Sequence, residues 1–414
     1  MSRGLTLPLL TAVFAVHFLD RQVLAILITP IKAELGLSDT ALGFLSGFAF
    51  TVFFSTVGLV IARIADVANR AHIITWSLAA FSVMTAACGL ATNFWQLLAA
   101  RIGVGVGEGG TNPASHALIA ELYPLQQRAT AMATYSIGPH LGLVLAFGLG
   151  GWLSQIVGWR VTFMLAGALG LVLTVVTNFA LRDPRESGAR RVERTDARNV
   201  PSAGAALRAM MVSPTLRNLL AGATLATGAA IGLITWLPAF LARSHGLGPA
   251  QIGVFLALVF GVAGGCGTYA GGRIADTAAG SLASRKLHVV AIAHVLLSIV
   301  WPFALLADTR TVALAALIVP CALTGFYLGP TLAMVQSTID PRVRAFSAAL
   351  LLLVANLFGA GLGPLAVGML SDALAPQTGT ASLRYALLLM PALLLWSALH
   401  YLRAARTVAA EIRG

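Results

Sequence analysis

The sequence predicts an all-α membrane protein with twelve transmembrane helices in two pseudo-symmetric six-helix bundles. Hydrophobic residues make up 58% of the 414 residues and charged residues only 10%, with a mean hydropathy of +0.85. Soluble globular chains have roughly 25% charged residues. A bilayer core of roughly 30 Å requires about 20 apolar residues per helix. Twelve stretches meet that requirement, and short motifs repeat between the two halves.

The twelve predicted spans follow one another along the chain with mostly short connections. They cover about 5–31, 41–65, 72–92, 95–120, 129–153, 160–181, 216–240, 250–272, 287–306, 312–336, 346–370 and 383–402. The longest connection, 182–215, is rich in arginine and is interrupted by three prolines. Such composition is typical of a linker. We therefore predict an N-terminal bundle at 1–181, a cytoplasmic linker at 182–215 and a C-terminal bundle at 216–414.

Basic residues are distributed unevenly between the two sides that this topology defines. With both termini inside, twenty Lys and Arg residues fall on the cytoplasmic side and five on the outer side. Because positive charge favours cytoplasmic loops, this distribution supports an even number of spans. It also accounts for the net charge of +12 without nucleic-acid binding, since no segment is long enough for a soluble basic domain.

Short motifs of the first half recur in the second half in the same helical order. The offsets lie between 210 and 225 residues, close to half the chain. Parallel repeats with a binding site at their interface are a common transporter plan. The matched motifs are Ala62–Asp66 with Gly272–Asp276, Pro124 and Arg128 with Pro341 and Arg344, and Gly138-Pro139 with Gly363-Pro364.

The fourth span includes the glycine-rich segment Arg101–Gly110. Its glycines form the pattern G-x-G-x-x-G, which is typical of dinucleotide-binding sites. A dinucleotide site would need a preceding strand and an acidic residue about 20 positions later. The sequence around the glycines indicates neither. The glycines instead recur every four residues within an apolar span, and small residues at this spacing allow helices to approach closely in lipid. We therefore predict that they pack helices.

Three polar residues of the fourth span share one helix face. Arg101, Glu108 and Asn112 are separated by seven and four residues, about two turns and one turn of an α-helix. An ionisable residue inside a membrane span is costly and points to function. Each residue also has an alternative interpretation without a role in transport. Arg101 could lie at the outer end of the helix and extend its charged group to the membrane interface, and Glu108 could serve only to stabilise the fold.

The first span adds His17, Asp20 and Arg21. Asp20 and Arg21 point about 100° apart around a helix, so each needs a partner elsewhere, and Arg101 and Glu108 are available. Two acids and two bases sum to a charge near zero. Protonating one acid would leave a single positive charge that favours an anionic group. We therefore hypothesise proton-linked transport at this cluster.

The spans of the C-terminal half are nearly uncharged. Trp236, Tyr327 and Asn356 are the candidates there for lining a substrate cavity, although such residues are more often packing or interface residues. His294 is interpreted as a structural histidine. A charged first half and an apolar second half suit an amphiphile, with its polar head toward one and its hydrocarbon along the other.

Other classes of function have weaker support in the sequence. A membrane-embedded lipid enzyme would need a nucleophile with a nearby base, or clustered metal ligands, but the histidines are scattered and no H-E-x-x-H motif occurs. The three cysteines lie far apart in apolar stretches and are expected to be buried. A passive channel would need a filter-like motif. We expect no cofactor and no bound metal.

Several motifs are similar to those of the major facilitator superfamily. The loop Arg63–Arg70 resembles its cytoplasmic motif, with Asp66 and Arg70 kept and Val67 at the place of the usual arginine. The resemblance implies that Asp66 and Arg70 form a cytoplasmic gate. Asp276 and Arg128, from the repeated motifs, are the further gate candidates.

Three segments resemble the spinster family of sphingolipid and lysolipid transporters. They are Phe18–Gln22, Arg101–Glu108 and Trp236–Pro238, whereas Gly109 departs from the alanine that often follows the family's glutamate. The resemblance implies coupling and substrate roles for Asp20, Arg21 and Glu108.

The residues and the resemblance together predict a secondary active transporter. We expect proton coupling, alternating access and an amphipathic substrate of the lysophospholipid or sphingolipid type. We also expect a multi-pass monomer in the bacterial inner (plasma) membrane, with both termini cytoplasmic. The alternative is an organic-anion symporter or drug exporter of the same superfamily.

Overall fold

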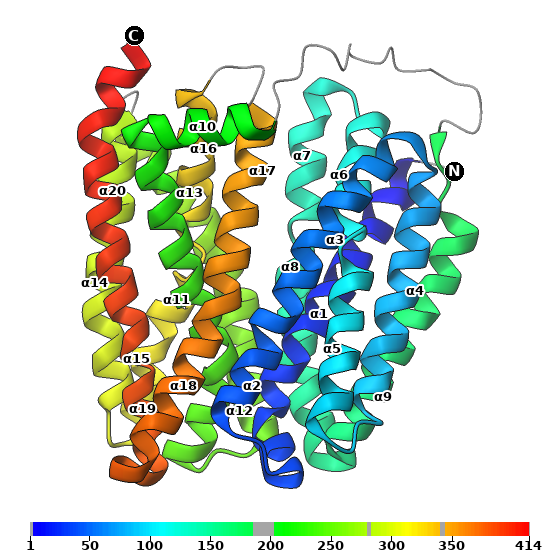
Figure 1. Cartoon of the computed structure of the whole chain (residues 1–414), viewed down its shortest axis with the longest axis vertical. Helices are drawn as coiled ribbons and strands as arrows, with labels where there is room; N and C mark the ends of the chain where they lie inside the picture. The colour runs from blue at the N-terminus through cyan, green and yellow to red at the C-terminus, as the bar shows by residue number, and fades with distance from the viewer. Residues whose placement is uncertain (1–2, 185–202, 280–282, 340–343, 414) are drawn as a thin grey trace. The chain divides into compact units, whose positions relative to one another are not determined.

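The computed structural model describes residues 3–184, 203–279, 283–339 and 344–413 (Figure 1). Nearly all of these residues are helical, and no strand occurs among them. The chain divides into two compact units, which we describe separately. Unit 1 lies within Met1–Glu193 and Leu237–Val262, and unit 2 within Arg194–Trp236 and Ala263–Gly414.

Unit 1 is an assembly of helices from the first half of the chain, joined by a short segment from the second half. Its helices are α1 (Arg3–Leu35), α2 (Asp39–Ser46), α3 (Phe48–Val67), α4 (Arg70–Cys88), α5 (Phe94–Glu108), α6 (Thr111–Leu122), α7 (Leu125–Tyr135), α8 (Gly138–Val144), the π-helix η1 (Leu145–Leu149), α9 (Gly150–Ala180) and α12 (Pro249–Leu256). Asn69 and Asn93 cap α4 and α5, each accepting a hydrogen bond from a backbone N–H three residues later.

Unit 2 contains most of the remaining helices. They are α10 (Ala203–Val212), most of α11 (Pro214–His245), α13 (Gly264–Ala279), α14 (Ala283–Leu306), α15 (Arg310–Ala322), α16 (Leu328–Thr338), α17 (Arg344–Val354), the π-helix η6 (Ala355–Ala360), α18 (Gly361–Thr378), the short η7 (Gly379–Ala381), α19 (Ser382–Ala386) and α20 (Leu389–Arg413). The π-helix η4 (Ala257–Ala263) joins α12 to α13.

Helix breaks recur at matching places in the two halves. Gly36 ends the first span and Gly246 the seventh, 210 residues later, and both have φ of 62°. This left-handed backbone is easily adopted only by glycine. The fourth span breaks between α5 and α6, and the tenth breaks between α15 and α16. The repeat seen in the sequence motifs therefore extends to the helix interruptions.

Eight helical segments among the described residues are long and apolar enough to cross a membrane. One of them, Gln126–Ala180, contains both the fifth and sixth spans, which separate at Gly158, where the backbone is not helical. The fourth and tenth spans are each split into two short helices, and the last span is divided between α19 and α20. With these breaks considered, the predicted spans agree with the twelve-helix fold.

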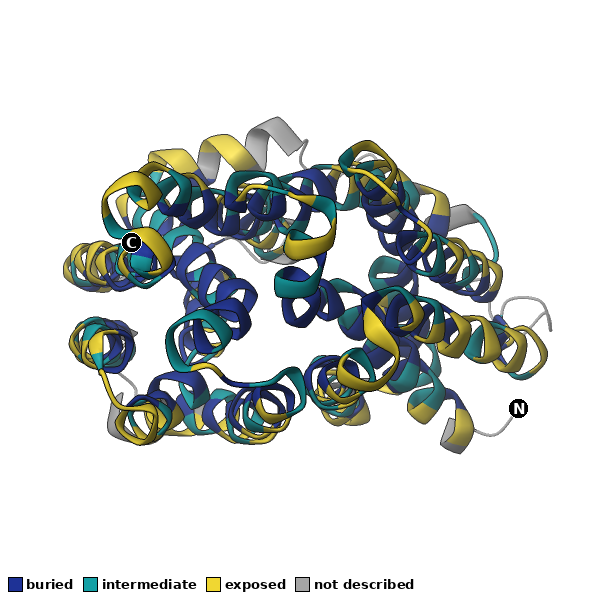
Figure 2. Ribbon diagram, turned by 90° about the horizontal axis from the view of Figure 1, so that it is seen from below, coloured by how far each residue is buried: buried dark blue, intermediate teal, exposed yellow. Residues whose placement is uncertain are grey.

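Large apolar side chains are exposed along the helices of both units. Trp76 is 75% exposed and Phe179 77% in unit 1, and Ile299 is 64% exposed in unit 2. Figure 2 shows such exposed positions as stripes along helices that are otherwise buried. An apolar surface of this kind would favour aggregation in water, whereas in a membrane the same side chains contact the hydrocarbon chains of the lipids. The chain is therefore an integral membrane protein.

The predicted linker contains one helix that the sequence did not indicate. Residues 185–202 of that segment lie outside the described residues, whereas Ala203–Val212 forms α10. Met210 of α10 is fully buried in the main apolar core of unit 2, together with Leu219, Leu287 and Tyr401. This core also joins α11, α14, α16 and α20.

Candidate functional site

The glycines of α5 bring its two neighbours very close. A Cβ atom at Gly105 would lie 2.7 Å from the carbonyl oxygen of Phe50 on α3. At Gly107 it would lie 2.6 Å from the backbone nitrogen of Phe81 on α4. Both distances are too short for real Cβ contacts, so α3 and α4 approach α5 only because these side chains are absent. This confirms the prediction that the glycines pack helices.

Glu108, in the last turn of α5, is completely buried against α1. Its Oε2 atom lies 2.6 Å from Nε2 of His17, and the two side chains are 0% and 1% exposed. The atoms are at ion-pair distance, but their orientation is not that of an aligned hydrogen bond. The sequence named both residues as candidates without predicting that they pair.

Arg101 and Asp20 also meet inside unit 1, but not as a side-chain ion pair. The Arg101 guanidinium donates from Nη1 to the backbone carbonyl oxygen of Asp20 at 3.2 Å. The Asp20 carboxylate is fully buried and forms no ion pair with the described residues. The sequence offered Arg101 and Glu108 as partners for Asp20 and Arg21. No direct side-chain ion pair joins them among the described residues, but Asp20 interacts electrostatically with Arg101, and Arg21 with Glu108.

Phe50, which the sequence analysis missed, lies beside both arginines. The guanidinium carbons of Arg21 and Arg101 both lie 5.2 Å from the centroid of the Phe50 ring. A ring face attracts a cation within about 6 Å, particularly where water is scarce. Phe50 therefore lies beside two guanidinium groups, which also interact electrostatically with the carboxylates of Glu108 and Asp20.

Asn112 is joined to the cluster through aromatic side chains. Its Oδ1 atom accepts a hydrogen bond from the Tyr135 hydroxyl at 2.7 Å. The Tyr135 ring stacks on Phe14, with centroids 4.5 Å apart, and Phe14 contacts the His17 ring. Tyr135 was missed because only its hydrogen bond, and no charge or motif, distinguishes it from a packing residue.

A second set of charged residues in unit 1 lies at the ends of the spans that we predict to be external. Asp39 is 2% exposed and is contacted by Lys32 at 2.6 Å and by Arg243 through both carboxylate oxygens, at 2.7 and 2.8 Å. Nearby in sequence, Glu34 accepts hydrogen bonds from Arg160. These pairs join segments up to 204 residues apart.

Arg70 connects several segments at the opposite ends of the helices. Its guanidinium donates to the carbonyl oxygens of Ala65 and Ala117 and pairs with Glu121, while its backbone N–H donates to Asp183 at 2.8 Å. This arrangement joins α3, α4, α6 and the end of α9.

Arg128, another predicted gate residue, contacts the end of α6. Arg128 donates to the Tyr123 carbonyl oxygen at 3.4 Å, near the end of α6. The side chains of Asp66 and Asp276 lie outside the described residues, so their gate roles stay a prediction.

Trp236, Tyr327 and Asn356, the residues of unit 2 predicted to line a substrate cavity, lie in different surroundings. The Trp236 indole is fully buried and donates to the Pro364 carbonyl oxygen at 2.8 Å, which joins α11 to α18. Asn356 is half-buried in η6 and donates to the Leu352 carbonyl oxygen. Tyr327 shares a hydrogen bond of 2.7 Å with Thr227.

Tyr327 belongs to a buried network of neutral polar groups that sequence reasoning did not anticipate. Its ring contacts His294, and His294 contacts both Tyr401 and the Ser397 hydroxyl. The Tyr401 hydroxyl lies 2.6 Å from that of Thr331. Unit 2 therefore contains buried polar groups without formal charge, whereas unit 1 contains buried ions.

The cluster in unit 1 has the components of a site whose charge responds to protonation. It combines two carboxylates, two guanidinium groups and one imidazole, and His17, Asp20, Arg101 and Glu108 are each at most 1% exposed. Buried charges are unfavourable unless balanced, so binding of a proton and of an ion at such a site depend on each other. No group of metal-ligating side chains suited to an ion occurs among the described residues.

Comparisons with known proteins agree with this architecture. Residues 10–364 match the model of the Major Facilitator Superfamily. An "MFS-type efflux pump" of Mycolicibacterium smegmatis (strain ATCC 700084 / mc(2)155) is 31% identical over 92% of this chain and 88% of its own length. A "Probable L-galactonate transporter" of Escherichia coli (strain K12) is 25% identical over 67% of this chain and 63% of its own.

A solved structure extends the similarity over the whole fold. The inward-facing, unoccupied crystal structure of a bacterial homolog to the human lysosomal transporter Spinster superposes with a TM-score of 0.86. It has 26% sequence identity and covers 99% of both chains. A family match over most of the chain, with the same helical fold, establishes the class of protein. The chain belongs to the Major Facilitator Superfamily and is a spinster-like secondary transporter.

Proposed function

We propose that this transporter couples proton movement to the transport of an amphipathic, lipid-like substrate of the lysophospholipid or sphingolipid type. The observation that carries the proposal is the contact between His17 and Glu108, 2.6 Å apart and almost fully buried. A carboxylate and an imidazole can each bind a proton, so two proton-binding groups are in contact here. Their position inside a membrane span favours a functional role.

The charge of the cluster provides the coupling. With His17 neutral, two carboxylates balance Arg21 and Arg101. A proton bound by His17 or Glu108 leaves one positive charge unbalanced. That charge attracts the anionic part of a substrate, most directly at the two arginines beside Phe50. Loss of the proton restores the balance and weakens the hold on the anion.

The contrast between the units favours an amphiphile over a wholly polar substrate. Unit 1 contains the buried ions, whereas the buried polar side chains of unit 2 described above are neutral. A molecule with a charged head and a hydrocarbon tail matches both environments. The resemblance of Phe18–Gln22, Arg101–Glu108 and Trp236–Pro238 to the spinster family implies the same substrate class.

An organic-anion symporter or drug exporter is the second candidate. The relatives named as an L-galactonate transporter and an efflux pump favour it. The same arginines would bind a carboxylate as readily as a phosphate, because both accept paired hydrogen bonds from a guanidinium.

The transport cycle in this proposal is alternating access by a monomer in a bacterial plasma membrane, with both termini cytoplasmic. The halves at 1–181 and 216–414 would act as the two bundles, and 182–215 as the linker. Asp66, Arg70, Arg128 and Asp276 would form the cytoplasmic gate. Asp39 and Arg243 would hold the external side closed.

Uptake into proteoliposomes with an imposed pH gradient tests the proposal. We would compare a lysophospholipid with a sugar acid for the wild type, Glu108→Gln and Asp308→Asn. Asp308 is 93% exposed, so its variant controls for loss of one acidic charge. Gradient-driven lysophospholipid transport should be lost only in Glu108→Gln. Unaltered coupling in that variant would refute the proton role, and exclusive transport of the sugar acid would refute the lipid substrate.

A further inference from the structure

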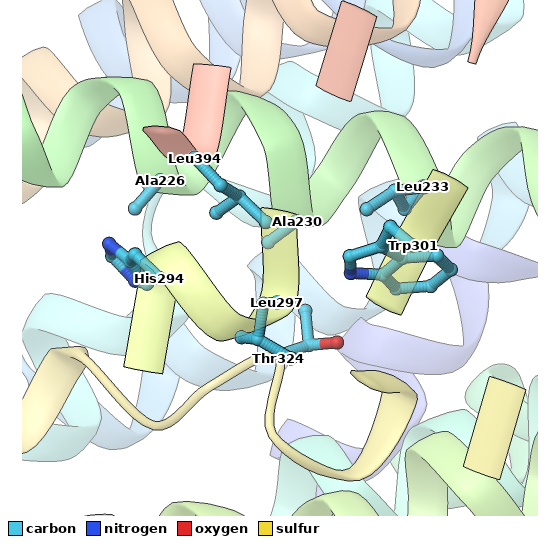
Figure 3. A pocket seen from close by; sticks show the side chains of 8 residues that line it. All are labelled: Ala226, Ala230, Leu233, His294, Leu297, Trp301, Thr324 and Leu394. Carbon is cyan, nitrogen blue, oxygen red and sulfur yellow. The ribbon is translucent and has the colours of Figure 1, made fainter. Parts of the chain in front are cut away.

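A pocket inside unit 2 and the outer surface of unit 2 differ in what they can bind. The pocket, between α11, α14, α20 and the end of α15, has a volume of about 10 Å³ (Figure 3). That volume holds one water molecule. A larger ligand of unit 2 has to bind outside this pocket, and the exposed side of α10 offers such a surface.

Three kinds of surface follow one another around α10. Met210 is fully buried in the apolar core of unit 2. At about 100° per residue, Leu207 and Met211 lie on the next face, and Arg208 follows them. Leu207 is 43% exposed and Met211 45%, and the side chain of Arg208 is exposed as well. The buried face of α10 is therefore followed by exposed aliphatic groups and then by a positive charge.

A second arginine lies at the C-terminal end of α10. Arg217, exposed near the start of α11, donates from Nη1 to the carbonyl oxygen of Met211 at 3.5 Å. This bond uses one of the five N–H donors of a guanidinium group. The exposed aliphatic groups of α10 therefore lie close to two guanidinium groups, those of Arg208 and Arg217.

The C-terminal helix fixes α10 in place on unit 2. Figure 1 shows α10 lying across the ends of the upright helices of this unit. Glu411 of α20 accepts hydrogen bonds from the Ser213 hydroxyl and from the backbone N–H of Thr215, the latter at 3.1 Å. The Thr215 and Thr407 hydroxyls are 2.6 Å apart. Because these contacts hold the junction of α10 and α11 against α20, the exposed side of α10 has a defined position at the helix ends.

We propose that α10 and the start of α11 bind an anionic phospholipid of the surrounding membrane. Its acyl chains would cover Leu207 and Met211, and its phosphate would accept hydrogen bonds from Arg208 and Arg217. Helices at the membrane interface combine apolar residues that enter the edge of the hydrocarbon region with basic residues at the level of the headgroups. This inference does not depend on which substrate the protein transports.

The charge of the two arginines selects an anionic phospholipid over a zwitterionic one. Anionic headgroups attract basic residues near the membrane surface. The choline group of a zwitterionic phospholipid instead adds a positive charge beside the phosphate, which two guanidinium groups repel. A free phosphate would satisfy the arginines but would leave Leu207 and Met211 exposed to water. A phospholipid with net negative charge satisfies both parts of the surface.

Lipid binding to the purified full chain tests the inference. Native mass spectrometry in a maltoside detergent would titrate phosphatidylglycerol and phosphatidylcholine against the wild type, Arg208→Gln, Arg217→Gln and Arg310→Gln. Arg310 is the control, because it is exposed at the start of α15 in the same unit. An arginine near an anionic lipid surface contributes about fivefold to binding. We expect about fivefold weaker phosphatidylglycerol binding in Arg208→Gln and in Arg217→Gln, and wild-type binding in Arg310→Gln.

Equal binding of the two phospholipids to the wild type would overturn the inference, as would wild-type phosphatidylglycerol binding in either Arg208→Gln or Arg217→Gln. A lipid bound elsewhere on the protein, including in the transport site, would not respond to these substitutions. All three arginines are exposed, so the variants should melt with the wild type in the absence of lipid. Added phosphatidylglycerol should then raise the melting temperature of the wild type and of Arg310→Gln more than that of the other two variants.

Two further measurements separate a phospholipid from a free phosphate. Leu207→Ser keeps both arginines, and we expect several-fold weaker phosphatidylglycerol binding because the acyl chains lose an apolar contact. Leu399→Ser is the control, since Leu399 is 49% exposed on α20 of the same unit. Glycerol 3-phosphate, which lacks acyl chains, should not displace phosphatidylglycerol at equal concentration. Displacement by glycerol 3-phosphate, or wild-type binding in Leu207→Ser, would show recognition of phosphate alone and would overturn the lipid assignment.

Discussion

His17 on α1 and Glu108 on α5 are in direct contact, with Nε2 and Oε2 2.6 Å apart and both side chains almost completely buried. They are separated by 91 residues in sequence, and both lie within unit 1. A buried carboxylate needs a compensating partner, and the imidazole provides one that can itself gain or lose a proton. In the proposed mechanism the proton would therefore have two adjacent positions within the cluster.

Replacing His17 by glutamine should weaken coupling while preserving the fold. Glutamine can donate to Glu108 but cannot take up a proton, so we expect several-fold fewer protons moved per substrate. Simultaneous measurement of proton and substrate flux in proteoliposomes checks this ratio. His72→Gln is the matched control, because His72 is exposed on α4 of the same unit. An unchanged ratio in His17→Gln would exclude a proton-carrying role for the imidazole.

Gly105→Ala should destabilise the protein. The new Cβ would meet the Phe50 carbonyl oxygen at 2.7 Å, so α3 must move away from α5. Overpacking of this kind costs about 1–3 kcal/mol. Thermal melting in detergent measures the effect. Gly329→Ala is the control, since a Cβ at that helical position meets nothing within 4 Å. Equal melting temperatures for the two variants would contradict close packing at Gly105.

Asp39→Asn should weaken the ion pairs with Lys32 and Arg243. The carboxylate is 2% exposed and contacts Lys32 and Arg243, which are 35% and 17% exposed. Breaking a fully buried pair costs about 3–5 kcal/mol, and partial solvation of the cations should reduce this to about 1–3 kcal/mol. A double-mutant cycle with Arg243→Gln measures the interaction through thermal stability. Additive effects of the two substitutions would argue against direct coupling.

Arg70→Lys should impair the protein although the charge is kept. Lysine cannot reproduce the planar group that reaches Ala65, Ala117 and Glu121 together. We expect a loss of about 1–2 kcal/mol in stability and a slower transport rate. Arg310→Lys is the control, because Arg310 is exposed. Wild-type stability and rate in Arg70→Lys would show that only the charge at this position matters.

The sequence alone determined the class of fold and the type of residues in the site. Composition and apolar length predicted the membrane helices, and the four-residue spacing of glycines predicted close packing of α5. Both signals are local, because they depend on the 3.6-residue period of one helix and on the thickness of the bilayer. The cost of burying charge similarly identified Glu108 and Asp20 before any neighbour was known.

Only the tertiary structure decided which of these side chains meet. It placed Glu108 in contact with His17, directed Arg101 to a backbone carbonyl, and brought Arg243 to Asp39 across 204 residues. Periodicity specifies the face on which a residue lies, but not the neighbouring helix or its axial register. Those depend on how side chains from distant parts of the chain fill space together, which no single segment encodes.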